Sequence, residues 1–205
     1  MPIFFTGLAA ALAYFAAIHG PETFGRSALK TAPVVLFALA AWQMDAPVKI
    51  AVGLALSAVG DWALSRNGDR AFLAGLCAFA MAHIFYAVVF VKYYSGLDLW
   101  PLVLVMVGLG ASTEFWLTPH TGKLRGPVRV YVGLISVMMI AALGLPSDLR
   151  IATIGAAFFV LSDLILSIRL FRLSEQGWVA KRASEALWIF YIAGQAMIAY
   201  TGKSF

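Results

Sequence analysis

The sequence predicts an all-α protein, a polytopic membrane helix bundle with about eight transmembrane helices in one integral membrane domain, residues 1–205. Hydrophobic residues make up 62% of the chain and charged residues only 12%, whereas a typical soluble domain contains about 25% charged residues. The mean hydropathy is +0.87. The charged residues are gathered in short breaks between long apolar stretches, so the chain has too little polar surface for a soluble fold.

The apolar stretches approach the roughly 20 residues that a helix needs to cross a bilayer. Each break between them contains charge, proline or glycine, which marks a loop. The second stretch is the shortest and contains Pro33. We expect transmembrane helices at residues 2–18, 30–44, 48–65, 71–91, 99–117, 127–143, 150–168 and 183–201.

Lysine and arginine are distributed unequally between the two ends of these helices. Eleven lie at the end that contains the first, third, fifth and seventh connections between helices, and four lie at the opposite end. Cytoplasmic loops of membrane proteins are enriched in these residues. The first end is therefore predicted to be cytoplasmic and both termini non-cytoplasmic, in a bacterial inner membrane. The net charge of +5 is interpreted as a topology signal, and no nucleic-acid partner is expected.

Two aspartates interrupt the apolar helices in a similar local pattern. Asp61 lies in "GDWALS", residues 60–65, and Asp163 lies in "SDLILS", residues 162–167. An ionisable group inside a membrane helix costs about 2.5–3.5 kcal/mol even on lenient scales, so it indicates a functional site. Ser57 shares a helix face with Asp61 because four residues separate them. The alternative is that each aspartate only bonds to a neighbouring helix or pairs with an arginine.

The predicted topology gives the two aspartates a common depth. Asp61 precedes Arg66 by five residues, and Asp163 precedes Arg169 by six. With a rise of about 1.5 Å per residue, each carboxyl group is expected roughly 8–9 Å inside its basic anchor, in the cytoplasmic half of the membrane.

The two aspartate-containing helices also resemble each other over a longer stretch. Residues 51–65 align without a gap on residues 153–167, with five identities in fifteen positions that include both aspartates. This similarity predicts a parallel duplication, residues 1–95 and 96–205, of the kind found in some transporters. The alternative is that apolar sequences match each other by chance.

Several other polar side chains are expected within the helices. They are Lys30, His83, Tyr86, Tyr131, Ser162, Tyr191 and Gln195. A lone buried histidine is more often a satisfied hydrogen-bonding group than a ligand, and the tyrosines and the glutamine are alternatively contacts between helices. The histidines do not cluster, so no metal site is predicted, and no nucleotide-binding glycine motif or serine-hydrolase elbow is present. No cofactor is expected, and the set suits acid–base chemistry or proton movement.

These residues, taken in order, resemble the YhhN family of membrane proteins. The matching motifs are "GDWALS", "AHIFY" at residues 82–86, "FVLSDLILS" at residues 159–167 and "FYIAGQ" at residues 190–195, together with Lys30 and Tyr131. The family usually has proline directly after the lysine, whereas here Pro33 is three residues further on.

The resemblance implies the activity of the animal members of the family, which are lysoplasmalogenases. These ether hydrolases cleave the sn-1 vinyl-ether bond of a lysophospholipid to a fatty aldehyde and a glycerophospho-alcohol. Such a bond breaks when its β-carbon takes a proton, which needs one carboxylic acid and one carboxylate, as in glycosidases. Asp61 and Asp163 are expected to share a proton across the bundle, with their individual roles left open. The other polar side chains would orient water or substrate, and Lys30 or Arg66 would hold the phosphate.

Two other functional classes compete with this interpretation. A small-solute or proton-coupled transporter also uses buried carboxylates and parallel repeats, although its site usually lies near the membrane midplane. A purely structural protein leaves both buried acids unexplained. Release of aldehyde by purified protein in detergent distinguishes the hydrolase from both, because no gradient exists there.

Overall fold

The computed structural model describes residues 1–174 and 177–205, and it is helical throughout apart from short connections. The described residues form eight α-helices that correspond one to one with the predicted stretches. They are α1 (Pro2–Ala17), α2 (Phe24–Gln43), α3 (Val48–Leu64), α4 (Asp69–Lys92), α5 (Trp100–Trp116), α6 (Arg125–Leu143), α7 (Arg150–Arg172) and α8 (Trp178–Thr201). Four short 3₁₀ segments accompany them: η1 (Thr118–His120), η2 (Gly122–Leu124), η3 (Ser147–Leu149) and η4 (Gly202–Ser204).

Five helical segments of the described chain are long and apolar enough to cross a membrane. They begin at Phe24, Asp69, Trp100, Gly122 and Ser147, and thus contain α2, α4, α5, α6 and α7. Helix α1 is equally apolar but has only 16 residues. The chain is therefore an integral membrane protein, and a count of eight crossings stays a prediction.

Helix α2 begins six residues earlier than predicted. The Thr23 side chain caps the helix by accepting a hydrogen bond from the Arg26 backbone N–H at 3.2 Å, and such a cap favours a helix start. Pro33 lies inside the helix and does not end it. Lys30 consequently lies near the end of the second helical turn, not at the start of the helix as the sequence suggested.

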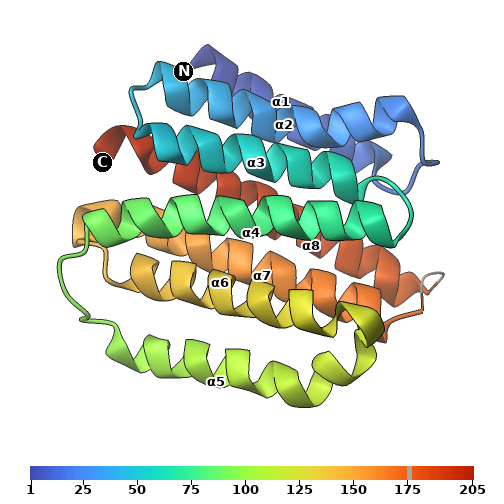
Figure 1. Ribbon diagram of the computed structural model, residues 1–205. Coiled ribbons are helices and arrows are strands. Elements are labelled where there is room, and N and C mark those ends of the chain that lie inside the picture. The colour runs from blue at the N-terminus through green and yellow to red at the C-terminus, as the bar shows by residue number, and fades with distance from the viewer. Residues whose placement is uncertain (175–176) are drawn as a thin grey trace.

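Six helices form a closed ring in which each packs against its neighbour. The order around the ring is α2, α3, α4, α6, α7, α8 and back to α2. Helix α1 packs outside the ring against α2 and α8, and α5 packs outside it against α6. Successive helices run in opposite directions, and the two chain ends lie at the same end of the bundle (Figure 1).

The helices pair in the same order in both halves of the chain. Helices α1 to α4 pack successively, as do α5 to α8. Between the halves, α2 contacts α8 and α4 contacts α6. Helix α2 corresponds to α6 and α4 to α8, so these two contacts are equivalent. This pairing is the one that a parallel duplication requires, and the duplication itself stays a prediction.

With eight antiparallel helices, most basic residues lie at one end of the bundle. The end with the α1–α2, α3–α4, α5–α6 and α7–α8 connections carries Arg26, Lys30, Arg66, Arg70, Lys123, Arg125, Arg129, Arg169, Arg172, Lys181 and Arg182. We call it the basic end. The opposite end carries Lys49, Lys92, Arg150 and Lys203. Which end faces the cytoplasm stays a prediction from this asymmetry.

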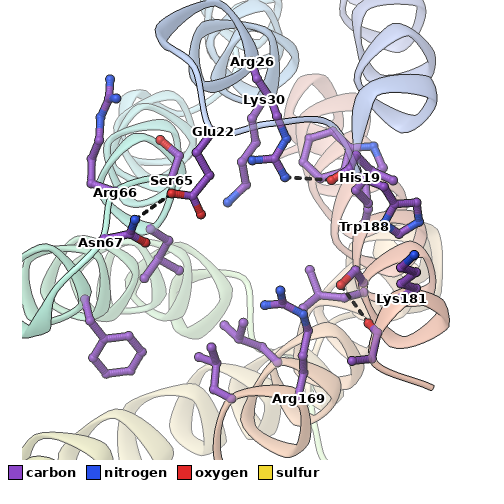
Figure 2. Close-up of a pocket in the computed structure, with 18 of the residues that line it drawn as sticks. His19, Glu22, Arg26, Lys30, Ser65, Arg66, Asn67, Arg169, Lys181 and Trp188 are labelled. Carbon is purple, nitrogen blue, oxygen red and sulfur yellow. Dashed lines mark hydrogen bonds between the residues drawn. The ribbon is translucent and has the colours of Figure 1, made fainter. Parts of the chain in front are cut away.

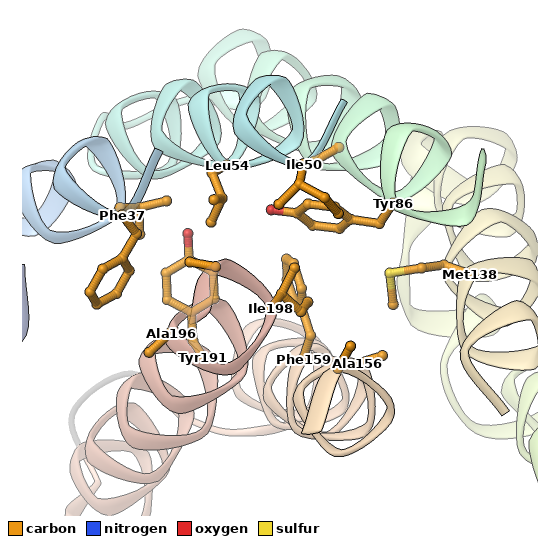
Figure 3. Packing of buried hydrophobic residues seen from close by; sticks show 14 of the residues in the cluster. Phe37, Ile50, Leu54, Tyr86, Met138, Ala156, Phe159, Tyr191, Ala196 and Ile198 are labelled. Carbon is orange, nitrogen blue, oxygen red and sulfur yellow. The ribbon is translucent and has the colours of Figure 1, made fainter. Parts of the chain in front are cut away.

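Large apolar side chains occupy both the centre of the bundle and its outside. Phe37, Leu54, Tyr86 and Phe159 are fully buried where the ring helices meet (Figure 3). On the outside, Phe115 is 84% exposed, as expected for a helix surface in contact with lipid.

Glycine allows α7 and α8 to approach closely. A Cβ atom added at Gly194 of α8 would lie 2.7 Å from the carbonyl oxygen of Gly155 of α7, and one added at Gly155 would lie 2.9 Å from the Gly194 carbonyl. Small residues at such positions are typical of contacts between membrane helices. This contact sets the spacing between α7, which carries Asp163, and α8, which carries Tyr191.

Candidate active site

Asp61 is bound by two side chains from other helices. It lies in the last turn of α3, and only 2% of the residue is exposed. The Tyr191 hydroxyl of α8 donates a hydrogen bond of 2.6 Å to Oδ2. The Lys30 ammonium of α2 lies 3.5 Å from Oδ1. Both carboxylate oxygens are therefore engaged, and three helices build this part of the site.

Asp163 has a different environment on α7. The Tyr131 hydroxyl of α6 donates a hydrogen bond to its Oδ2. Among the described residues no lysine, arginine or histidine forms an ion pair with Asp163. Each aspartate thus meets a side chain of the helix that precedes it, but the partner is a cation for Asp61 and a neutral phenol for Asp163.

A layer of aromatic rings connects the two carboxyl environments. Tyr191 packs against Phe159, with ring centroids 5.5 Å apart, and Phe159 packs against His83 at 4.8 Å. His83 in turn packs against Tyr131 at 5.2 Å. Within the described part of the chain no hydrogen bond joins the two carboxyl groups directly. The aspartates are therefore linked through their tyrosines.

Polar atoms without partners lie beside this layer. His83 and Gln195 are both fully buried. Both ring nitrogens of His83 and the side-chain nitrogen of Gln195 lack a hydrogen-bond partner in the described residues. Native proteins leave few buried polar groups unpaired except where water or a ligand binds. His83 thus has no protein hydrogen-bond partner among the described residues, and the role of its ring nitrogens stays a prediction.

Tyr86 and Gln195 form a contact between helices. The Tyr86 hydroxyl of α4 donates a hydrogen bond of 2.9 Å to the Gln195 Oε1 of α8. The sequence left this as an alternative to a role in binding, and the structure contains the bond.

The serines beside the aspartates donate to backbone carbonyls. Ser57 donates to the Gly53 carbonyl at 3.0 Å, and Ser162 donates to the Phe159 carbonyl at 2.7 Å. Both acceptors are one turn back on the same helix, a common way for a helical serine to satisfy its hydroxyl. Their supporting role at the carboxyl groups stays a prediction.

The aspartates also differ in their distance from the ends of their helices. Helix α3 ends at Leu64, so Asp61 lies in its last turn, whereas α7 continues to Arg172. Asp163 is therefore more than two turns before the end of α7. The prediction of equal depth used Arg66 and Arg169 as equivalent anchors, but Arg66 follows its helix and Arg169 lies inside one.

A cavity of about 640 Å³ opens at the basic end between α1, α2, α7, α8 and the α3–α4 connection (Figure 2). Lys30 lines this cavity and also contacts Asp61. Lys30 is thus the direct link between the cavity and the first carboxyl group. We call this space the basic cavity.

A second hollow, of about 30 Å³, is lined by Asp163 and Tyr131. This volume is about the size of one water molecule. We call this space the acid cavity. It shares a wall with the basic cavity, formed by Leu64, Phe72, Leu166, Leu170 and Phe171. The two spaces are neighbours, separated only by apolar side chains.

Arg169 is a lining residue of the basic cavity that the sequence did not identify. Its position after an apolar stretch made it an interfacial anchor, and no motif distinguished it from Arg172. The sequence did not show that α7 continues to Arg172. Arg169 therefore lies within the helix, and its side chain lines the cavity.

Comparison with known proteins places the chain in a family. The model of the YhhN family matches residues 25–201, which include both aspartates and all of their partners. The chain belongs to the YhhN family.

Three relatives illustrate what this YhhN-family chain is similar to. It is 37% identical over 136 residues to human "Lysoplasmalogenase TMEM86A", covering 60% of this chain and 54% of the relative. It is 30% identical over 152 residues to a Mycobacterium bovis protein named "Lysoplasmalogenase", covering 71% and 56%. It is also 30% identical over 138 residues to "Uncharacterized membrane protein YhhN" of Escherichia coli O6:H1, covering 64% of each.

The matched region spans less than two thirds of the length of these curated relatives. No solved structure is significantly similar to the chain.

Proposed function

We propose that this protein hydrolyses the sn-1 vinyl-ether bond of a lysoplasmalogen, releasing a fatty aldehyde and a glycerophospho-alcohol. The observation that carries the proposal is the unequal pairing of two carboxyl groups inside the bundle, the buried Asp61 with a lysine and the half-buried Asp163 with a phenol. The names of two relatives support the substrate class.

The reaction needs a proton donor and a stabiliser of positive charge. A proton added to the β-carbon of the vinyl ether leaves an oxocarbenium ion at the α-carbon. Water adds to this cation and loses a proton, which gives a hemiacetal. The hemiacetal then collapses to aldehyde and alcohol. One carboxylic acid and one carboxylate divide these steps, as in glycoside hydrolysis.

The pairing assigns a role to each aspartate. Asp61 has the Lys30 ammonium at 3.5 Å and accepts a hydrogen bond from Tyr191, and both contacts stabilise a carboxylate. Asp163 is half-buried and has no cation beside it in the described residues, and a carboxyl group withdrawn from water without a cation avoids the cost of its charge by binding a proton. Asp163 therefore donates the proton to carbon, and Asp61 stabilises the cation and accepts the proton of the attacking water.

The unpaired buried atoms supply a place for that water. The two His83 nitrogens and the Gln195 amide nitrogen have no partner among the described residues, and one water molecule typically satisfies two to four such groups. His83 is in ring contact with Tyr131, the partner of Asp163. These residues hold the water close to the cation formed beside the acid.

The position of the site also fits a lipid substrate of one leaflet. Both cavities lie at the basic end, which the distribution of lysine and arginine predicts to be cytoplasmic. The substrate is then taken from the inner leaflet of a bacterial inner membrane, with no metal ion or cofactor used in the reaction.

The test is aldehyde release from a lysoplasmalogen by purified protein in detergent. Wild-type protein is expected to release aldehyde, and Asp61→Asn and Asp163→Asn to lose it. Asp148→Asn, at an exposed residue of η3 at the opposite end, is the matched control. Absence of aldehyde from wild type, or near-normal turnover in both site variants, contradicts the proposal. The first result favours a transporter, since a carrier needs a gradient that detergent lacks.

A further inference from the structure

We propose that the basic cavity binds the phosphodiester of the lysolipid headgroup through Arg169 and Lys30. The inference rests on the proposed function for its lipid, but the site itself is argued from the charges that line the cavity. No motif or named relative points to Arg169 as a binding residue.

Most charged side chains around the basic cavity are exposed or already engaged. Arg26 donates to the backbone carbonyls of Ala17 and Ile18 at 3.3 and 2.7 Å. Arg66 is exposed and lies 4.5 Å from the centre of the Trp62 ring. Arg26 thus links the start of α2 to the end of α1, and Arg66 lies against Trp62 of α3.

The remaining charged groups lie at the mouth. Glu22 is exposed and accepts a 2.7 Å hydrogen bond from Asn67. Asp69 and Lys181 are exposed as well. They leave the interior of the cavity to the half-buried Lys30 and Arg169.

Arg169 is partly buried and has an unused hydrogen-bond donor. Its Nε atom is buried and has no hydrogen-bond partner among the described residues. Figure 2 shows the Arg169 guanidinium reaching into the cavity from α7, while Lys30 reaches in from α2 on the opposite wall. A guanidinium binds phosphate oxygens through two parallel N–H donors, and an ammonium adds a point charge. The interior therefore suits one anionic phosphate between two helices.

The neighbouring acid cavity determines how the bound lipid is oriented. Arg169 and Asp163 are both on α7, six residues apart, which is roughly 9 Å along the helix axis. This separation is comparable with the extended length of glycerol between a phosphate and an sn-1 vinyl ether. A phosphate at Arg169 therefore brings the vinyl ether to Asp163. The alkenyl chain reaches it once the shared apolar wall moves, because the acid cavity is only about 30 Å³.

The site is tested with glycerophosphoethanolamine, which has the headgroup but neither the chain nor the reactive bond. Its binding to purified protein in detergent is measured by calorimetry, with glycerol and inorganic phosphate as comparison ligands. We expect wild type to bind glycerophosphoethanolamine and not glycerol. Arg169→Gln should weaken binding about tenfold or more, since hydrogen bonds between charged groups are lost. Arg169→Lys should lose less, and Arg70→Gln, at an exposed residue outside the cavity, should bind as wild type.

The outcomes separate this proposal from the proposed function. Unchanged binding by Arg169→Gln, or tighter binding of inorganic phosphate than of the diester, overturns the headgroup site even if aldehyde is released. An Arg169-dependent affinity without aldehyde release supports the phosphodiester site and contradicts the vinyl-ether reaction. Arg169→Lys keeps the test valid if Arg169→Gln does not fold, which thermal unfolding of both variants detects.

Discussion

The Lys30 ammonium of α2 lies 3.5 Å from the Asp61 carboxylate of α3, and the two side chains are only 17% and 3% exposed. The corresponding helix pair in the second half, α6 and α7, brings Tyr131 to Asp163 instead. The same local arrangement thus has a charged version and a neutral version. In the proposed mechanism, this difference lets one carboxyl group act as the base and the other as the acid.

Lys30→Met is expected to remove hydrolysis and to lower stability. Breaking a buried ion pair by removing one partner typically costs about 3–5 kcal/mol, because a buried charge is left alone. The double variant Lys30→Met/Asp61→Asn carries neither charge and should be more stable than Lys30→Met, while remaining inactive. Thermal unfolding in detergent and aldehyde release measure the two effects. A Lys30→Met protein as stable and active as wild type would show that the pair has no such role.

Tyr131→Phe is expected to slow the proton-transfer step. The variant loses the hydrogen bond to Asp163, which strengthens as Asp163 gives up its proton and becomes a carboxylate; a hydrogen bond to a charged group contributes about 1.5–3 kcal/mol. The corresponding loss in kcat is roughly tenfold to a hundredfold. Tyr93→Phe, at the opposite end of the bundle, is the control and should keep its rate. Equal rates for the two variants would contradict a role for Tyr131 in orienting the acid.

His83→Leu is expected to reduce activity with little change in stability. Both ring nitrogens lack a protein partner among the described residues, and in the proposed mechanism water is their partner. Replacing a buried polar group together with its partner by an apolar group is nearly neutral in stability, but it removes the proposed water site. The kcat should therefore fall while the unfolding temperature stays close to that of wild type. If His83→Leu lowers both together, the histidine has a structural partner rather than a catalytic water.

Gly194→Ala is expected to destabilise the contact between α7 and α8. The added Cβ would lie 2.7 Å from the Gly155 carbonyl oxygen, and overpacking of this kind typically costs about 1–3 kcal/mol. Gly133→Ala on α6 is a matched control because no atom of the described residues outside its own helix turn lies within 4 Å of the added Cβ. Thermal unfolding should separate the two variants, and equal unfolding temperatures would mean that the α7–α8 spacing adjusts freely.

Hydropathy was sufficient to predict the eight helices but not all of their ends. The apolar stretches fixed α3 and α6 to within two residues. The start of α2 was missed because its first turns are polar, and the helix there depends on the Thr23 cap rather than on apolar residues. Hydropathy also could not show that α7 continues past Arg169, since a basic residue normally marks the end of a membrane helix.

The aspartates could be predicted because a carboxyl group within an apolar helix is costly and therefore rare. Which tyrosine meets which aspartate could not be predicted, because Tyr191 reaches Asp61 across the two halves while Tyr131 reaches Asp163 within one. Such pairings depend on how the helices pack around the ring. That no described residue places a cation beside Asp163 is likewise visible only in three dimensions, and the proposed assignment of the acid depends on this feature.

The wall between the two cavities contains Leu64 of α3 and Leu166 of α7. These leucines occupy equivalent positions three residues after the two aspartates, one in each half of the chain. A substrate that spans both cavities therefore requires these side chains to move aside. A cross-link that fixes α3 to α7 at this level should then block the reaction while leaving headgroup binding in the basic cavity unchanged.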